Sequence, residues 1–496
     1  PAMPPPASRE AAPAAATPPP GDVMGGTGDV MGATAQLSRF VAETDGRAIP
    51  PGAIARARTA FVDVAATTLA GAAQPVGRIV TGWVREAGGT PAASVVAGGF
   101  KTGTAQAALA NGVMAHALLY DDTTFVTVAH HTVVLAPALL ALGEPRGASG
   151  RAVLEAYVIG YEVLTKLGRA LNPSHYEKGW HATISLGTVA AAAAAARLLG
   201  LDARRVEMAL GMAASMAGGS RQQFGTMTMP FHAGHAARSG VVAAELASRG
   251  VTADPGILES RMGYCALFAG PAGADPEQLT KGLGEGWEIQ VAGYVLKPYP
   301  CGAPLQRAVD AILGLRDRHK IDPAAVREIR VGVSYIFQGV LIRTDPQTGL
   351  EGKPSLEFCA AVAMLDGRLG LDAFTDERVH DAEVRAMMAR VRKHVDPALE
   401  RGAPGVATDP FGDRTTVTII LDDGRELSET VRFARGSPEN PMSRDELVGK
   451  YRDCARLSLD ERRAERALGL IERLDDLPTV APLMDALRGG RKPRRG

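Results

Sequence analysis

The hydrophobic residues between positions 35 and 290 recur at the spacing of α-helices. In residues 51–71, Ile54, Ala57, Phe61 and Val64 are three or four positions apart, which places them on one face of a helix. The same pattern predicts helices at residues 102–119, 133–143, 152–171, 184–200, 206–216 and 232–250. Many of these faces are rich in alanine, so backbones can approach closely and we expect an all-helical core.

The period changes from helix to strand after Pro298. Apolar and polar or small residues alternate around Ile329, Val331 and Val333, as they do in half-buried strands. Residues 415–421 are rich in β-branched side chains, and the Asp-Asp-Gly-Arg sequence that follows predicts a hairpin turn into a strand at 427–433. Helical patterns surround these strands at residues 304–320, 355–366 and 381–393.

Helical periodicity returns in residues 441–488, in the segments 442–458 and 459–474. This order of elements indicates that the last helices rejoin the first ones. We therefore predict a mainly α fold with a large all-helical domain built from both chain ends, residues 35–290 and 436–488, and an inserted smaller α+β domain at 291–435. Ligands commonly bind where two such domains meet.

The two ends of the chain differ from the rest in composition. Residues 1–34 are rich in proline, alanine and glycine, and residues 489–496 are basic, so we expect a disordered extension and a solvated tail. No positively charged segment precedes an apolar one, and no secretory signal is expected. Four cysteines lie far apart without a CxxC pair, which favours a reducing, cytoplasmic location.

Charge and composition exclude several classes of partner. The 496 residues carry 54 Lys and Arg against 54 Asp and Glu, so there is no global electrostatic case for binding nucleic acid or a membrane surface. No apolar run approaches the roughly 20 residues that a membrane span requires. Neither GxGxxG after a strand nor GxxxxGK[ST] occurs, so nucleotide binding has no support.

Seven of the ten histidines fall within a stretch of 120 residues: His116, His130, His131, His175, His181, His232 and His235. Histidine is the side chain best suited to proton transfer near neutral pH. Each one alone is more often structural than functional, but the group favours at least one functional member. No metal-binding motif is present, and we predict no metal site.

Three polar segments accompany these histidines. Asp121, Asp122 and Thr123 follow an apolar helical run, either as loop and capping residues or as carboxylates that orient an imidazole or take a proton. A polar loop at residues 218–230 contains Arg221, which could clamp a carboxylate, although the loop could also be a plain helix connection.

The third segment is Lys297-Pro298-Tyr299-Pro300-Cys301, at the predicted junction between domains. Its two prolines fix the backbone and hold Lys297 and Tyr299 at the junction. The alternative is a rigid linker with one exposed lysine. Cys301 fits a buried small hydrophobic residue better than a nucleophile, because the surrounding sequence matches no cysteine-nucleophile motif.

Taken in order, these phrases resemble the MmgE/PrpD family, which includes 2-methylcitrate dehydratase, cis-aconitate decarboxylase and iminodisuccinate epimerase. The matching phrases cover residues 111–123, 179–183, 224–234, 297–301, 345–355 and 435–441. The resemblance extends over residues 36–485, nearly all of the predicted ordered chain. It implies a helical domain with an inserted α+β domain, no cofactor, a homodimer, and a small carboxylate substrate bound between the domains.

The resemblance also implies roles for individual residues. His181 corresponds to the catalytic imidazole, and Lys297 to a lysine that binds a carboxylate or handles a proton. Asp121 and Asp122 complete the predicted catalytic set. The predicted substrate-binding residues are Thr123, His130, Arg221, His232 and Tyr299.

Two positions depart from the family pattern. Leu119 stands where the family usually has an acid, and Met229 stands where it usually has a lysine. Losing both leaves no uncompensated buried charge, but it also removes a cation that would attract a carboxylate. The substrate then has fewer carboxylates, the reaction differs, or catalysis is lost.

The leading hypothesis is a lyase of the dehydratase type that removes a proton next to a carboxylate or carbonyl. His181 would act as general acid or base, and Lys297, with Arg221, would hold the carboxylate and stabilise the enolate-like charge. A decarboxylase or epimerase could use nearly the same site. The alternative from another class is a non-catalytic protein that only binds ligand on this fold.

Overall fold

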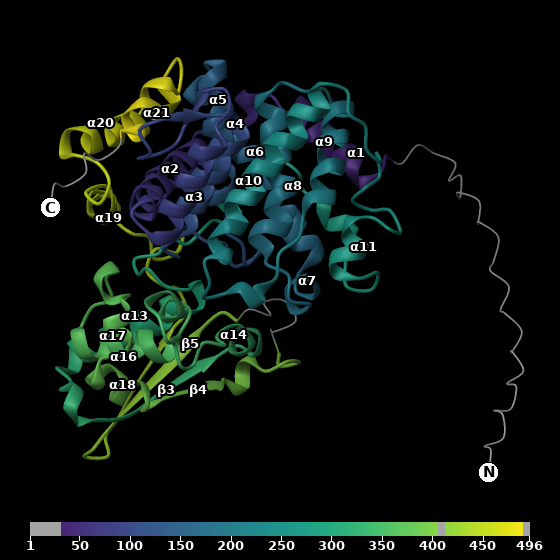
Figure 1. Ribbon diagram of the computed structural model, residues 1–496. Helices are drawn as coiled ribbons and strands as arrows, with labels where there is room; N and C mark the ends of the chain where they lie inside the picture. The colour runs from purple at the N-terminus through teal and green to yellow at the C-terminus, as the bar shows by residue number, and fades with distance from the viewer. Residues whose placement is uncertain (1–30, 405–411, 490–496) are drawn as a thin grey trace, which may run out of the picture.

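The computed structural model describes residues 31–404 and 412–489. Figure 1 shows a large helical body and, beside it, a smaller body with a sheet. The first and last described helices, α1 (Ala33–Glu43) and α21 (Ala481–Arg488), both belong to the helical body. This architecture confirms the predicted mainly α fold with a smaller α+β part.

The helical body contains elements from both parts of the chain. Besides α1 and α21, its helices are α2 (Pro51–Ala72), α3 (Pro75–Ala87), α4 (Thr104–His116), α5 (Thr132–Gly143), α6 (Gly150–Leu171), α7 (Ser174–Glu177), α8 (Ala182–Leu198), α9 (Ala203–Met216), α10 (Thr228–Ser248), α11 (Tyr264–Ala269), α12 (Glu288–Val291), α19 (Arg444–Ala455) and α20 (Glu461–Glu472). A short hairpin, β1 (Ala93–Ser94) with β2 (Lys101–Thr102), is an addition that the hydrophobic pattern does not predict.

Small residues set the packing at the centre of this body. Helix α10 packs along both α4 and α8. At the α4–α10 crossing, a Cβ atom on Gly112 would lie only 2.7 Å from Gly234 Cα, so only glycine allows the two backbones to come this close. Residues Ala190–Ala196 of α8 are fully buried, as expected for a helix surrounded by others.

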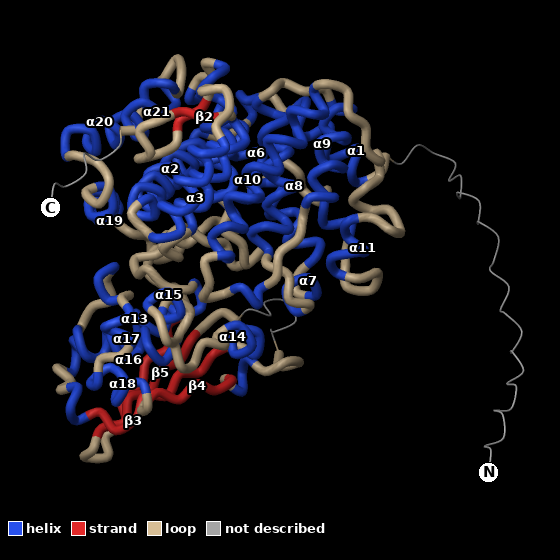
Figure 2. The backbone as a smooth tube through the Cα atoms, in the orientation of Figure 1, coloured by secondary structure: helices blue, strands red, loops and turns tan. Residues whose placement is uncertain are grey.

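The smaller body is built around a four-stranded sheet, red in Figure 2. Its order is β4 (Val391–Val395), β3 (Val326–Val333), β5 (Thr415–Leu421), β6 (Glu426–Val431); β3 pairs with β4 in parallel, and the other pairs are antiparallel. Its helices are α13 (Gln306–His319), α14 (Tyr335–Val340), α15 (Gly349–Gly352), α16 (Leu356–Asp366), α17 (Asp376–Val379) and α18 (Ala382–Met388).

Two expectations about boundaries were wrong. The helix predicted at 381–393 ends at Met388, and Lys393 lies in strand β4, which supplies an edge to the sheet. Helix α1 starts at Ala33, inside the segment predicted to be an extension, because Thr34 is buried and bonded to Glu259. The rest of the predicted extension, residues 1–30, and residues 490–496 of the predicted tail lie outside the described residues.

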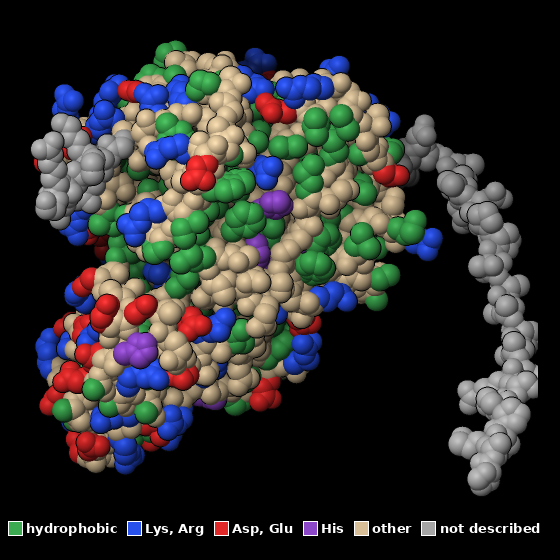
Figure 3. Space-filling model, in the orientation of Figure 1, with side chains coloured by type: hydrophobic (Ala, Val, Ile, Leu, Met, Phe, Trp, Pro, Cys, Tyr) green, Lys and Arg blue, Asp and Glu red, His purple; other side chains and the backbone are tan. Residues whose placement is uncertain are grey.

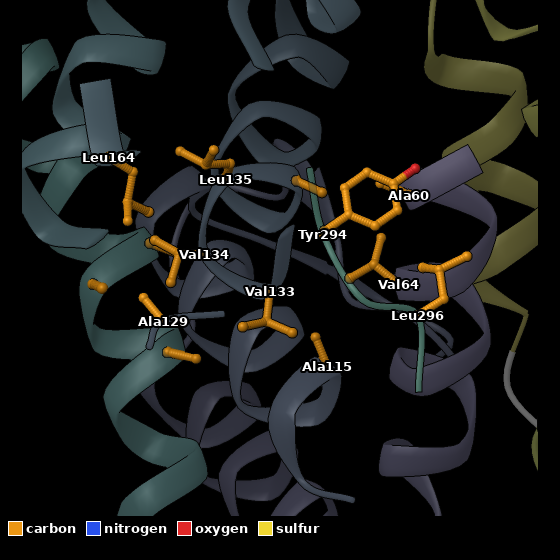
Figure 4. Close-up of a cluster of buried hydrophobic side chains, with 14 of the residues drawn as sticks. Ala60, Val64, Ala115, Ala129, Val133, Val134, Leu135, Leu164, Tyr294 and Leu296 are labelled. Atoms are coloured by element: carbon orange, nitrogen blue, oxygen red, sulfur yellow. The ribbon is translucent and has the colours of Figure 1, made fainter. Parts of the chain in front are cut away.

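The segment that leads from the helical body into the smaller one is anchored in the helical core. Figure 4 shows Tyr294 and Leu296 beside Val64 of α2, in a cluster that includes Val133 of α5. Val295 forms an antiparallel bridge with Thr123, with N···O distances of 2.7 and 3.1 Å. These contacts fix the position of the next residue along the chain, Lys297.

Among the described residues, no helix is both long and apolar enough to cross a membrane.

Candidate active site

Four imidazoles meet inside the helical body, each from a different element. His116 ends α4, His130 precedes α5, His181 occupies the N-cap position of α8, and His232 lies in the second turn of α10. Ring centroids are 4.5 Å apart for His116 and His130, 6.0 Å for His116 and His181, and 5.2 Å for His181 and His232. All four side chains are buried.

Backbone contacts explain why these residues meet. His116 lies one helical turn after Gly112, at the close crossing of α4 with α10, and His232 lies next to the same crossing on α10. The His181 backbone N–H donates to the Gly219 carbonyl oxygen, at 2.9 Å. The His130 backbone N–H donates to Thr183 Oγ1 at 3.2 Å, which joins the start of α5 to the start of α8.

Asp121 lies between two of the imidazoles. Its carboxylate is 3.0 Å from His116 Nδ1 and 2.7 Å from His130 Nδ1. Burial opposes ionisation, but His116, His130 and Lys297 together hold the pKa of Asp121 well below its usual range. Burial lowers the pKa of His130 to about 4. Asp121 is therefore an anion that orients two rings.

This geometry fixes which ring nitrogens carry protons. His130 Nδ1 faces two acceptors at 2.7 Å, the Asp121 carboxylate and the Asp122 carbonyl oxygen, so it must donate. His116 Nδ1 faces both oxygens of Asp121, at 3.0 and 3.1 Å, and donates as well. His116 Nε2 is then the remaining ring nitrogen, and it is buried with no hydrogen-bond partner in the described part of the chain.

His116, Asp121 and His130 also offer three possible metal-ligand atoms within 4.8 Å of one another. Two imidazoles and one carboxylate are a donor set that divalent transition metals accept. The donor geometry fits a hydrogen-bonded network better, because both Nδ1 atoms already direct N–H groups at the carboxylate. We therefore interpret the cluster as an oriented imidazole–carboxylate network.

The second pair of imidazoles is His181 and His232, whose Nδ1 atoms lie 2.9 Å apart. Burial, followed by the neighbouring imidazoles, lowers the pKa of His181 well below its ordinary value. Burial likewise lowers the pKa of His232 to about 4. The positive end of the α8 dipole adds to this effect at His181. Both rings are neutral at pH 7, as suits groups that exchange protons with a ligand.

Lys297 reaches this cluster from the segment that joins the two bodies. It is fully buried, and its Nζ donates to the carbonyl oxygen of Leu119 at 2.8 Å. Leu119 has a φ of 53°, the left-handed region that leucine rarely adopts. Burial lowers the pKa of Lys297, and Asp121 opposes that shift. Lys297 is thus held close to an anion in a dry environment.

Asp122 and Thr123 have different surroundings from Asp121. Asp122 accepts a hydrogen bond from Thr132 Oγ1 at 2.8 Å, and burial, with the charges of Asp63 and Asp121, raises its pKa to about 8. Asp122 is therefore largely protonated at pH 7. Thr123 uses its backbone to bridge to Val295, so it ties the site loop to the segment carrying Lys297.

Two predicted binding residues have their contacts elsewhere. The Arg221 guanidinium lies over the ring of Tyr176, 4.1 Å from its centroid, rather than over a carboxylate. The Tyr299 hydroxyl donates to Asp310 Oδ1 in the smaller body, at 2.8 Å. Burial and Asp310 raise the pKa of Tyr299. The Arg221 backbone N–H donates to the Gly179 carbonyl oxygen at 2.8 Å, and Tyr299 lies two residues after Lys297, but the sequence does not reveal the direction of either side chain.

The two positions that depart from the family pattern are both inside the protein. Leu119 is 6% exposed and Met229 is 3% exposed. Leu119 contributes its carbonyl to Lys297, and Met229 lies in the first turn of α10, three residues before His232. An apolar pair at buried positions avoids the desolvation cost that an unpaired acid or lysine would carry there.

Two residues were absent from the predicted site. His116 lies within the 111–123 phrase, five residues before Asp121, and that spacing at a helix end is the signal that could have identified it. Lys450, from α19, donates to Asp63, to the Tyr120 carbonyl and to the Lys297 carbonyl. No local pattern links Lys450 to the site, since Asp63 lies 387 positions away.

Comparison with known proteins places this site in a family. Residues 35–277 match the MmgE/PrpD N-terminal domain, and residues 299–476 match the MmgE/PrpD C-terminal domain. A cis-aconitate decarboxylase of Aspergillus terreus (strain NIH 2624 / FGSC A1156) is 27% identical over 476 residues, covering 92% of this chain and 95% of the relative. The cis-aconitate decarboxylase of Mus musculus is 26% identical, covering 79% of this chain and 80% of its own length. Because the two matched domains span most of its length, the chain belongs to the MmgE/PrpD family.

Proposed function

We propose that this protein is a lyase that acts on a small organic acid, and that decarboxylation is its reaction. The observation that carries this proposal is the buried pair of neutral imidazoles, His181 and His232, beside Lys297 and the Asp121 anion. The similar proteins named above are cis-aconitate decarboxylases, which favours loss of carbon dioxide over loss of water. Dehydration would use the same acid and base groups and is the competing outcome.

In the proposed mechanism, Lys297 binds a carboxylate of the substrate. The bond between the departing carboxylate and the carbon chain breaks, carbon dioxide leaves, and the electron pair stays on the carbon as an enolate-like anion. An anionic substrate raises the pKa of His181, because an opposite charge favours the imidazolium. His181 then gives its proton to the carbanion and regains one through His232.

The apolar side chains of Leu119 and Met229 affect which substrate we propose. A tricarboxylate would place two more charges than Lys297 alone balances, in a buried site. We therefore propose a substrate with fewer carboxylates than cis-aconitate, carrying an apolar group against Leu119 and Met229.

A ligand panel tests the proposed function. Citrate, methylcitrate, cis-aconitate and mono- and dicarboxylate analogues are screened by thermal shift, because a ligand raises apparent stability by mass action. Compounds that bind are then followed for release of carbon dioxide and for water loss. Release of carbon dioxide from a bound acid supports the proposal. Water loss without carbon dioxide would assign a dehydratase, and binding without turnover would assign a non-catalytic protein.

We also propose that the protein forms a homodimer through the face made by α3 and the start of α10, here called the α3–α10 face. It carries four exposed large hydrophobic side chains, Ile79, Trp83, Met227 and Phe231. Figure 3 shows hydrophobic side chains gathered on this side of the helical body. Trp83 is 50% exposed, which is costly in water unless a partner covers it.

Light scattering after size exclusion tests this interface. The wild type is expected to run as a dimer, and Trp83→Glu is expected to convert it to a monomer. Leu267→Glu changes a leucine on α11 that is even more exposed than Trp83, and serves as the control. A monomeric wild type, or a dimeric Trp83→Glu variant, would contradict the proposal.

A further inference from the structure

The ammonium of Lys450 joins three separate parts of the site. Its Nζ lies 2.6 Å from Asp63 Oδ1 on α2, 2.6 Å from the Tyr120 carbonyl oxygen and 2.9 Å from the Lys297 carbonyl oxygen. It also lies 3.9 Å from the centroid of the Tyr120 ring. Lys450 and Asp63 are both buried, with side chains 2% and 1% exposed.

The bonded carbonyls belong to the residues next to the proposed chemistry. Tyr120 precedes Asp121, the anion that orients His116 and His130. Lys297 carries the ammonium that reaches back to the Leu119 carbonyl. The two lysines therefore bind neighbouring carbonyl groups of the same loop. The Lys297 side chain holds the carbonyl of residue 119, and Lys450 holds that of residue 120.

We propose that Lys450 is a positioning residue, supplied by the C-terminal helix α19, that fixes the Leu119–Thr123 loop and the Lys297 backbone relative to one another. The kinetic test of this role rests on the proposed function, because it measures turnover by the groups that the proposed mechanism uses. Lys450 acts through the backbone of its neighbours, and Asp63 balances its charge in the apolar interior.

A buried ion pair does not by itself indicate such a role. Replacing both partners by neutral groups is often harmless to stability. Here, however, the ammonium donates to two carbonyls besides its carboxylate. Those carbonyls lie on segments far apart in the sequence, and Lys450 bonds to both of them, in addition to the Thr123–Val295 bridge and the Lys297–Leu119 hydrogen bond that also join the segments. Removing the ammonium leaves both carbonyls without this donor, in a site that excludes water.

Lys450 also acts on Lys297 electrostatically. The titratable groups facing Lys297 come from its own segment and from several other elements: Asp121, Asp122, His130, Cys301, Lys353, Asp63 and Lys450. Burial is the largest cause of the lowered pKa of Lys297, and the Lys450 charge lowers it further. Neutralising Lys450 should raise the pKa of Lys297 and move the alkaline limb of kcat/KM to higher pH.

The experiment compares Asp63→Asn with Asp63→Asn/Lys450→Met. Asp63→Asn keeps the ammonium and an acceptor for it, so the two variants differ only at Lys450, and the double variant leaves no unpaired buried carboxylate at position 63. Asp63→Asn leaves the buried Lys450 ammonium without its countercharge and should be less stable than the wild type. The ammonium still donates to both carbonyls, so we expect the folded variant to keep its turnover. The double variant should lose at least about tenfold in kcat with little change in KM, and its alkaline limb should move upward. If Asp63→Asn/Lys450→Met does not fold, Asp63→Asn/Lys450→Gln is used in its place.

Amide hydrogen exchange tests the proposal without any substrate. Protection of the Thr123 and Val295 amides, which form the bridge between the two segments, should fall at least about tenfold in the double variant relative to Asp63→Asn. Unchanged protection together with unchanged kcat would overturn the role of Lys450. If even the wild type turns over no carboxylate, the proposed function fails, and the exchange result alone decides the positioning role.

Discussion

The Nδ1 atoms of His181 and His232 lie 2.9 Å apart, where the start of α8 meets the start of α10. One ring must donate and the other accept, so the tautomer of His181 depends on that of His232. His232, at 5% exposure, is the member of the pair closer to solvent. The pair can therefore pass a proton from one ring to the other.

Replacing His181 should strongly reduce turnover without unfolding the protein. We expect His181→Asn to reduce kcat by roughly 10²- to 10⁴-fold, the usual contribution of a general acid or base. Melting temperature and circular dichroism check that the variant is folded. His235→Asn alters another imidazole, half-buried three residues after His232 on the same helix, and should keep wild-type kcat. Full activity in His181→Asn would exclude His181 as the acid.

The pH profile should lack the limb near pH 6.5 that an ordinary histidine gives. Burial lowers the pKa of His232 to about 4 and moves that of His181 further down. The free enzyme then keeps both rings neutral as pH falls from 7 to about 5. Because His181 must take up a proton before it can protonate the carbanion, we expect kcat/KM, which reports free-enzyme groups, to rise steadily over this range instead of levelling below pH 6.5. A limb centred near 6.5 would contradict the neutral pair.

Replacing each of the two adjacent aspartates by asparagine should affect activity differently. Asp122 has a pKa of about 8, so Asp122→Asn resembles its protonated form, and activity at pH 7 should change little. Asp121 is an anion that accepts from two imidazoles. Asp121→Asn would place an amide N–H against one of these donors, at a cost of about 1–3 kcal/mol, and kcat should fall. Equal losses in both variants would refute this distinction.

Much of the fold could be predicted because helical periodicity is a local signal. Residues 51–71 were predicted as a helix, and α2 spans Pro51–Ala72. Strand β4 was missed because its sequence, Val-Arg-Lys-His-Val, is mostly polar and only Val391 is buried, as suits the edge of a sheet. A short polar strand next to a helix carries too little pattern to be separated from it.

The site was harder to predict than the fold because its contacts are between distant residues. His181 and His232 are 51 positions apart, and no spacing rule relates them. The phrases around Asp121 and Lys297 identified two segments that meet in the structure, but not the hydrogen bond from Lys297 to the Leu119 carbonyl. The contacts of Arg221 with Tyr176 and of Tyr299 with Asp310 could not be predicted either, since a sequence does not show which way a side chain points.

Leu119 and Met229 should determine how many carboxylates the site accepts. We expect the double variant Leu119→Asp/Met229→Lys to gain turnover of cis-aconitate or methylcitrate, because it restores both charges that the family usually has. Each single variant buries one unpaired charge, so each should be less stable than the double. Thermal shift with each acid and product analysis provide the test. If the double variant turns over these acids no faster than either single variant, the two positions do not cooperate in determining the substrate.

Acid should destabilise the protein partly through His131, which lies outside the proposed chemistry. Burial lowers its pKa to about 3, its Nδ1 has no hydrogen-bond partner among the described residues, and its ring stacks on Tyr161 at 4.2 Å. Between pH 6.5 and 3 the unfolded chain binds a proton at this residue and the folded one does not. The free energy of unfolding therefore falls as pH falls, by up to about 1.4 kcal/mol per pH unit.

Replacing His131 with phenylalanine isolates this contribution. His131→Phe keeps an aromatic ring against Tyr161 and removes the titrating group. Urea unfolding at pH 6.5, 5.5 and 4.5 should show a free energy that declines less steeply than in the wild type, by roughly one proton. His319→Asn changes an exposed histidine at the end of α13 and should leave the wild-type slope. If His131→Phe and the wild type decline in parallel, the buried imidazole is not a source of acid sensitivity.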